Sequence, residues 1–237
     1  MPNNVRNVVK MEGIENFPVI RTNEEGEKFF DFEVLIPMPK SLDMESGMIE
    51  EIAIEAAIRK IGKRRWDFQR PYTTPTMTDK KYSERVLNCG KSEDELVKLG
   101  LQYITNKIVH GATSWYDWRI DNWGTKWNSY DNEIENNCVK FSTAWSNPEP
   151  IIRKLSEKYP DLKVEHWWAD EDTGNETGHR ILLAGKDIGD VPDGYENGSQ
   201  EAYKCYEFCW GEMSKCFHRD ENGNWVKHEC EGCTGCD

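Results

Sequence analysis

The feature that most constrains the fold is a double change in hydrophobic period along the 237-residue chain. Up to about Lys40, apolar residues alternate with polar ones, as in "FFDFEVLIP" at residues 29–37, which is the period of a half-buried strand. From Gly47 to about Gly111 the period is that of amphipathic helices, and then the alternation returns. This order predicts an α+β fold, an antiparallel sheet with helices on one face.

The period also predicts the strands and the domain boundaries. We expect the sheet to include residues 29–37, 138–145, 162–168 and 179–185, with a weaker strand allowed around Val5 and Val9. Residues 1–204 then form one domain, in which residues 47–110 or so are a helical insertion, and residues 205–237 form a Cys/His-rich tail. Between two strands, "SNPEPIIRKLSEKYP" predicts a short helix capped by Ser146 or Asn147.

The best-defined helix is "SEDELVKLGLQYITNKIVHG". It opens with a capping box, Ser92 with Glu95, and closes on Gly111. Its spacing predicts a buried stripe made of Val97, Leu101, Ile104 and Ile108.

Four tryptophans crowd the segment of residues 114–131, with charged and amide residues between them. Their large apolar area favours a place in the core, and we expect the rings of Trp123 and Trp127 to point inward with Lys126 at a rim. Cations among indoles also suit the wall of a binding site. The candidate binding residues are Tyr116, Asp117, Arg119, Asn122, Trp123, Lys126, Trp127 and Trp145.

The charge balance narrows the choice of partner. With 43 acidic and 30 basic residues the net charge is -13, which opposes binding to duplex nucleic acid and favours a protein partner with a basic surface. No apolar run approaches the roughly 18 residues of a membrane span. The first residues, "MPNNVRNVVK", do not have the hydrophobic stretch of an export signal, so we expect a cytosolic protein that does not enter a membrane.

The tail holds a possible metal site. Cys230, Cys233 and Cys236 have C-x-x-C-x-x-C spacing, and Cys216 could complete a four-thiolate site for one structural zinc ion. His218 or His228 could replace one thiolate. The alternative is a tail of free thiols, as is common in a reducing compartment.

Enzyme motifs are mostly absent. The chain has no P-loop, no G-x-S-x-G, no H-E-x-x-H and no Gly-rich dinucleotide motif. His166 lies on the apolar side of its strand, where a core imidazole is the commoner role, and His179 could face it from the neighbouring strand. We therefore expect a protein that is not an enzyme.

Several segments carry a resemblance to a known family. "MPN" at the start, "LIPMP", "WYDWRIDNWGTKW" and "FSTAWSNPEPIIRKLSEKYPDL" resemble the YubB-like family, whose proteins are encoded by phages and conjugative plasmids. The resemblance extends from Met1 to about Trp210. It implies a ferredoxin-like domain and a mobile-element origin, and it implies no established activity.

Together these observations favour a phage or mobile-element protein that binds and inhibits a host protein, such as a nuclease-type defence effector. Two alternatives remain: a module that binds nucleotides or single-stranded nucleic acid through its indoles, and an enzyme that uses His166 and His179.

Overall fold

The computed structural model describes residues 3–61, 77–189 and 194–228, and the chain divides into two compact units. We call Met1–Pro37 together with Asp121–Asp237 the sheet unit, and Met38–Ile120 the helical unit. The helical block expected at about residues 47–110 falls within the helical unit.

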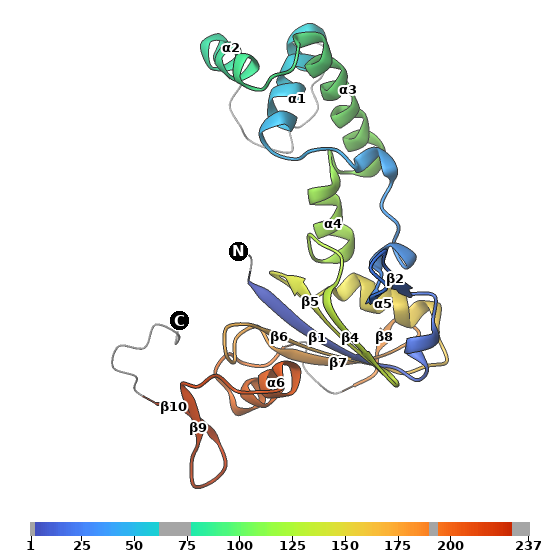
Figure 1. The fold of residues 1–237 in the computed structure, drawn as a ribbon, viewed down its shortest axis with the longest axis vertical. Coiled ribbons are helices and arrows are strands. Elements are labelled where there is room, and N and C mark those ends of the chain that lie inside the picture. The colour runs from blue at the N-terminus through green and yellow to red at the C-terminus, as the bar shows by residue number, and fades with distance from the viewer. Residues whose placement is uncertain (1–2, 62–76, 190–193, 229–237) are drawn as a thin grey trace. The chain divides into compact units, whose positions relative to one another are not determined.

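The sheet unit is built on six strands in the order β4-β5-β1-β6-β7-β8, and every neighbouring pair is antiparallel (Figure 1). The strands are β1 (Asn4–Lys10), β4 (Tyr130–Glu135), β5 (Cys138–Ala144), β6 (Val164–Asp170), β7 (Gly178–Leu183) and β8 (Lys186–Asp187). Helix α5 (Glu149–Lys158) connects β5 to β6, and β1 lies between these two strands. Two parallel strands split by a third are the arrangement of a ferredoxin-like fold. The predicted α+β class is confirmed.

Helices pack on both faces of the sheet, which corrects the expectation of one covered face (Figure 1). Helix α6 (Gln200–Trp210) packs its buried cysteines against Val8 and Ala169. Arg180 belongs to the opposite face, where it forms an ion pair with Glu149 of α5 at 3.2 Å. Successive strand residues point to opposite faces, so each helix buries its own set of strand side chains.

The strand expected at residues 29–37 is wrong in extent and in position. Only β3 (Lys28–Phe30) is extended, and it pairs with β2 (Ile20–Thr22) in a separate hairpin. Asp31 then accepts a hydrogen bond from the backbone N–H of Glu33 and caps a 3-10 turn, η2 (Phe32–Val34). Phe30, at the end of β3, and Phe32, in η2, are both buried, and both rings contact Phe141.

The helical unit contains α1 (Met48–Ile61), α2 (Asp79–Asn88), α3 (Glu93–His110) and the start of α4 (Trp115–Trp123). The capping box of Ser92 with Glu95 and the left-handed end at Gly111 are confirmed. Neither α2 nor its cap, Thr78, is predicted from the sequence. Among the helices of the described residues, none has the length and apolarity of a membrane span.

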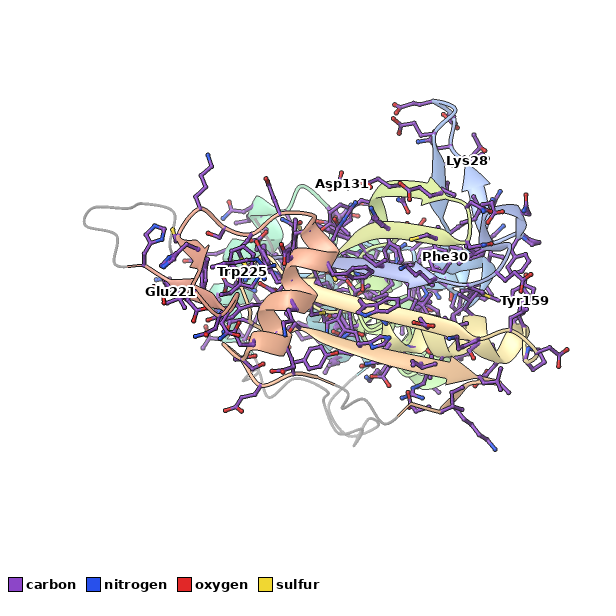
Figure 2. All side chains as sticks on the ribbon, turned by 90° about the horizontal axis from the view of Figure 1, so that it is seen from below. Lys28, Phe30, Asp131, Tyr159, Glu221 and Trp225 are labelled. Carbon is purple, nitrogen blue, oxygen red and sulfur yellow. The ribbon has the colours of Figure 1, made fainter. Side chains whose placement is uncertain are left out.

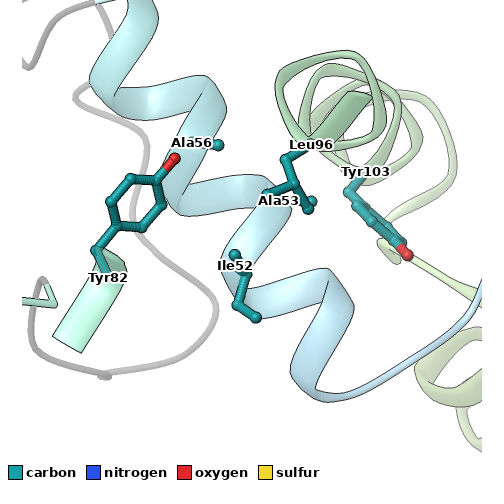
Figure 3. Close-up of a cluster of buried hydrophobic side chains, with 6 residues drawn as sticks. All are labelled: Ile52, Ala53, Ala56, Tyr82, Leu96 and Tyr103. Atoms are coloured by element: carbon teal, nitrogen blue, oxygen red, sulfur yellow. The ribbon is translucent and has the colours of Figure 1, made fainter. Parts of the chain in front are cut away.

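The buried side of α3 is not the stripe that the spacing predicts. Its buried residues are Leu96, Gly100, Tyr103 and Asn106, whereas Leu101 is 40% exposed and Ile108 is 57% exposed. Figure 3 shows Leu96 and Tyr103 with Ala53 of α1 in the cluster between these helices. A Cβ at Gly100 would lie 1.9 Å from the carbonyl oxygen of Ala53, so glycine is required where α1 and α3 meet.

Part of the expected tail is an ordered hairpin, β9 (Phe217–Arg219) with β10 (Trp225–Lys227). It packs on α6, as Figure 2 indicates at Trp225. The Gln200 amide donates to the carbonyl of Trp225 at 2.8 Å and accepts from its backbone N–H at 2.7 Å. Arg219 and Glu207 form an ion pair at 2.7 Å.

Candidate functional site

The tryptophan-rich segment divides between core and surface. Trp123 is fully buried, its ring packs edge-on against Phe32, and its indole N–H donates to the carbonyl of Ile36 at 2.8 Å. Trp118 is also buried. The expectation that the ring points inward is therefore right for Trp123. The prediction that Trp123 is a binding residue is wrong, because no part of its ring reaches the surface.

Trp127 and Trp145 are exposed, contrary to the expectation that the ring of Trp127 points inward. They are 38% and 46% exposed, and Lys126 lies between them. The Lys126 ammonium is 3.9 Å from the ring centre of Trp127 and 3.7 Å from that of Trp145, which are cation-π distances. We call Lys126, Trp127 and Trp145 the Trp–Lys–Trp stack. All three belong to the sheet unit.

The backbone presents Trp145 in an uncommon conformation. Strand β5 ends at Ala144, and Trp145 follows with a φ of 70°, in the left-handed region. Its N–H donates to the carbonyl of Asn3 at 2.9 Å. For a bulky residue this conformation costs about 1–2 kcal/mol, so the surrounding contacts must enforce it.

Those contacts come from the turns on either side of the stack. Thr125 donates through its hydroxyl to the carbonyl of Ala144 at 2.9 Å, and Ser146 donates to the carbonyl of Gly124. Gly124 has a φ of 79°, and a Cβ there would come within 2.9 Å of Pro150. The two segments that carry the indoles are thus joined by side-chain hydrogen bonds and close packing.

A series of buried hydrogen bonds supports the turn that carries Trp145. Thr143 donates to the carbonyl of Ser146 at 2.8 Å and accepts from the Asn7 amide at 2.9 Å. The side-chain amide oxygen of Asn7, Oδ1, in turn accepts from Nε2 of His166 at 2.9 Å, so that nitrogen carries the proton. Burial, together with the charge of Arg180, holds the pKa of His166 well below its ordinary value of 6.5. The imidazole is neutral and structural.

The proposed pairing of His166 with His179 is wrong in register. His166 lies opposite Arg180 and His179 lies opposite Trp167, so the two imidazoles point to opposite faces of the sheet. His179 stacks on Trp167 with ring centres 4.2 Å apart. Burial lowers the pKa of His179, and the nearby Glu165 carboxylate opposes that change.

Tyr130 is half-buried and adjoins the stack. Its ring lies edge-on to Trp127 at 6.2 Å, and its hydroxyl donates to the Asn4 side chain at 2.6 Å. Burial raises the pKa of Tyr130 to about 12, so the phenol stays protonated. The sequence prediction omits Tyr130, although the alternation of "YDNEIE" indicates a strand, in which Tyr130 lies on the half-buried side.

Tyr130 also lines a hollow of about 670 Å³ between β3 and β4. Figure 2 labels Lys28 and Asp131 on the two strands that flank it. The solvent-facing row of β4 is acidic, with Asp131, Glu133 and Glu135 all exposed. Glu133 forms ion pairs with Arg6 and, at 3.7 Å, with Lys140. The surface beside the stack is therefore polar and partly anionic.

The remaining candidate binding residues lie elsewhere along the chain. Tyr116, Asp117 and Arg119 belong to the helical unit, where the Arg119 guanidinium lies 5.2 Å from the ring centre of Trp115. Asn122 belongs to the sheet unit and is partly buried.

The metal site stays a prediction, because Cys230, Cys233 and Cys236 lie outside the described residues. Cys216 is disulfide-bonded, and in that state it cannot serve as a thiolate ligand. The rings of His218 and His228 are 5.7 Å apart. Within residues 3–61, 77–189 and 194–228, no group of three metal-binding side chains comes together.

Comparison with known proteins identifies the region that contains the stack. Residues 122–208 match a family model and are a ferredoxin-like domain. That model is described as the ferredoxin-like domain in Api92-like protein. Strand β1, at the centre of the sheet, comes from outside the matched region.

A crystal structure described as protein api92 from Yersinia pseudotuberculosis aligns with 84% of this chain and 100% of that chain. The two sequences are 11% identical and the TM-score is 0.35, which does not define a shared fold. No curated protein matches the chain.

Proposed function

We propose that this chain is a non-enzymatic protein that binds and inhibits a partner protein, with the Trp–Lys–Trp stack as its anchor. One observation carries the proposal: Trp145 keeps a left-handed backbone while the residue is 46% exposed. Backbone strain of this kind persists only where surrounding structure enforces it, and it gathers at functional sites. Tryptophan is enriched among the residues that contribute most to binding at protein interfaces.

The partner that fits has a basic surface. The net charge of -13 and the acidic row of Asp131, Glu133 and Glu135 would attract cations and speed association with a basic groove. A nuclease-type defence effector in the host cytosol has such a groove, because it must bind phosphates. The resemblance to proteins of phages and plasmids supports this choice of partner.

The test compares capture of host proteins by three forms of the full chain: wild type, the double variant Trp127→Ala/Trp145→Ala, and the control Val226→Ala. Val226 is 40% exposed on β10, away from the stack in sequence, so it matches the loss of an exposed apolar side chain. We expect a protein that the wild type and the control retain and the double variant loses, with retention weakening as salt rises. Equal capture by all three forms would contradict the proposal.

A second function is favoured by the position of Lys126 between two indole faces. A cation beside stacking surfaces is also how proteins hold single-stranded nucleic acid without sequence preference. Anisotropy titrations with labelled oligothymidine and with mononucleotides separate the two functions. Saturable binding that Trp145→Ala abolishes would replace the protein partner with a nucleic-acid ligand.

A further inference from the structure

The Trp–Lys–Trp stack holds a cation of its own between two aromatic faces. The ammonium of Lys126 lies over both rings, 3.9 Å from the ring centre of Trp127 and 3.7 Å from that of Trp145. Among the residues that the structure describes, no carboxylate forms an ion pair with Lys126. The attraction therefore comes from the negative faces of the two indoles, which is how aromatic sites recognise organic cations.

The two rings are held by contacts that do not involve the Lys126 side chain. The backbone N–H of Trp145 donates to the carbonyl of Asn3 at 2.9 Å, and the ring of Trp127 lies edge-on to Tyr130. Lys126 is half-buried, and a lysine stem of four carbons is flexible. If the Lys126 ammonium turns into solvent, both indole faces stay in place and become available to another cation.

The geometry of the stack suits a planar cation. Its two cation-to-ring distances, 3.7 and 3.9 Å, lie within the optimal range for contacts between carbon atoms, about 3.5–4.0 Å. A guanidinium group is planar, stacks on aromatic faces and is more weakly hydrated than an ammonium. Exchange of the Lys126 ammonium for a guanidinium would return the more strongly hydrated cation to water and leave the more weakly hydrated one between the rings.

Carboxylates beside the stack favour a cation over a phosphate. Tyr130 adjoins Trp127, and burial, together with the charges of Asp131 and Glu171, raises the pKa of Tyr130 to about 12. The Asp131 and Glu171 carboxylates both act on the Tyr130 hydroxyl, so they lie on the same part of the surface as the stack. Their charge attracts a guanidinium and repels a phosphate group.

Other cations on this side of the sheet unit have partners or positions of their own. Arg6 forms an ion pair with Glu133, and the Lys140 ammonium lies 3.7 Å from a Glu133 carboxylate oxygen. Lys28 is exposed and lines the hollow from β3. Lys126 is the cation that lies between the two indoles, so a ligand cation has to displace it.

We propose that Trp127 and Trp145 bind an arginine side chain of the partner protein, and that Lys126 occupies this site in the free chain and is displaced on binding. This inference rests on the proposed function, a partner with a basic surface, and adds the residue type that the stack recognises. The apparent affinity for arginine is then reduced to the fraction of chains in which Lys126 has left the site. Lys126 is an internal competitor.

The test uses three labelled peptides that differ in one residue type. They carry three arginines, three lysines or three citrullines separated by glycine and serine, and fluorescence anisotropy measures their affinity for the full chain. We expect the arginine peptide to bind at least about fivefold more tightly than the lysine peptide, because guanidinium stacks better on indole. The citrulline peptide, which has the shape of arginine without its charge, should bind most weakly. In Trp127→Ala/Trp145→Ala the arginine and lysine peptides should bind equally.

A second variant tests the displacement of Lys126. Lys126→Gln should raise the affinity for the arginine peptide by about threefold or more, because the internal competitor is gone. The matched control is Lys28→Gln, which removes the same charge from an exposed position beside the hollow and should change that affinity much less. Thermal unfolding checks that each variant is folded, and Trp127→Ala alone replaces the double variant if the latter is not.

Equal affinity of the wild type for the arginine and lysine peptides would overturn the proposal, as would an unchanged or lower arginine affinity in Lys126→Gln. Tighter binding of oligothymidine than of the arginine peptide would assign the stack to single-stranded nucleic acid instead. A host protein captured through the stack without a preference for arginine would reject this inference and leave the proposed function intact. A preference for arginine without any captured host protein would support the site and contradict the proposed function.

Discussion

At the scale of single residues, Trp145 holds a conformation that its side chain opposes. Because glycine adopts a positive φ without penalty, Trp145→Gly should be more stable than Trp145→Ala by about 1 kcal/mol. In an ordinary extended position the order would be the opposite. Urea denaturation of the two variants measures the difference directly. An alanine variant as stable as the glycine variant would mean that the backbone at this position is not strained.

His166 makes stability depend on pH. Its pKa is lowered in the folded protein, so below about 6.5 the unfolded chain takes up a proton that the folded chain refuses. The free energy of unfolding should therefore fall as the pH drops below that value, with a slope of up to about 1.4 kcal/mol per pH unit.

Denaturation curves between pH 7.5 and 6 measure this slope. His166→Gln should flatten it, because an amide does not titrate. His179→Gln is the control and should keep most of the slope, since Glu165 opposes the lowering of the His179 pKa. An unchanged slope in His166→Gln would assign the pH dependence to another group.

At the scale of elements, the packing of α3 against α1 requires a residue without a side chain at position 100. Gly100→Ala would ordinarily favour a helix by about 1 kcal/mol, but here the added carbon would lie 1.9 Å from the carbonyl oxygen of Ala53. Overpacking of this kind costs about 1–3 kcal/mol, so we expect a net loss of stability in thermal unfolding. The control is Thr105→Ala, at an exposed position of the same helix, which should leave the free energy of unfolding unchanged or raise it slightly.

The tail supplies a second prediction at this scale. Protein expressed with ample zinc and purified without a tag under reducing conditions should hold about one zinc ion per chain by elemental analysis. Oxidation should release the zinc ion, because Cys216 and the other predicted cysteine ligands bind zinc only as thiolates. A ratio near zero in the reduced protein would reject the site.

The limits of prediction from sequence follow from where each element finds its partners. Helix α3 is predictable because Ser92, Glu95 and Gly111 specify its ends locally. Residues 29–37 are not, because Asn128 and Asn132, about a hundred residues away, accept hydrogen bonds from the N–H groups of Phe32 and Phe30.

The same reasoning applies to the candidate site. Clustering of tryptophans in the sequence points to the right segment, and the charge of Lys126 among indoles predicts a cation-π contact. Which indoles are exposed depends on Asn3, Thr143 and Ala144, and no local pattern records those contacts. Likewise, spacing along α3 indicates an apolar arc without indicating which part of it α1 covers.

At the scale of the whole molecule, the sheet unit and the helical unit each have a buried core, and we expect them to respond separately to damage. Trp123→Ala should lower the free energy of unfolding of the sheet unit by about 3–5 kcal/mol and speed hydrogen exchange in β1 and β5. The exchange rates of α1 should not change. Gly100→Ala should speed exchange in α1 and α3 alone. If either variant accelerates exchange in both units equally, the two cores unfold as one.

The central place of β1 has a consequence for the order of folding during synthesis. Residues 4–10 are synthesised before their partners, which are residues 138–144 in β5 and 165–170 in β6. At about 5–20 residues per second, more than ten seconds can pass before β6 is available. During that interval the helical unit is already translated, whereas β1 remains an apolar segment without a sheet. A chaperone that binds short extended segments would find its target in β1.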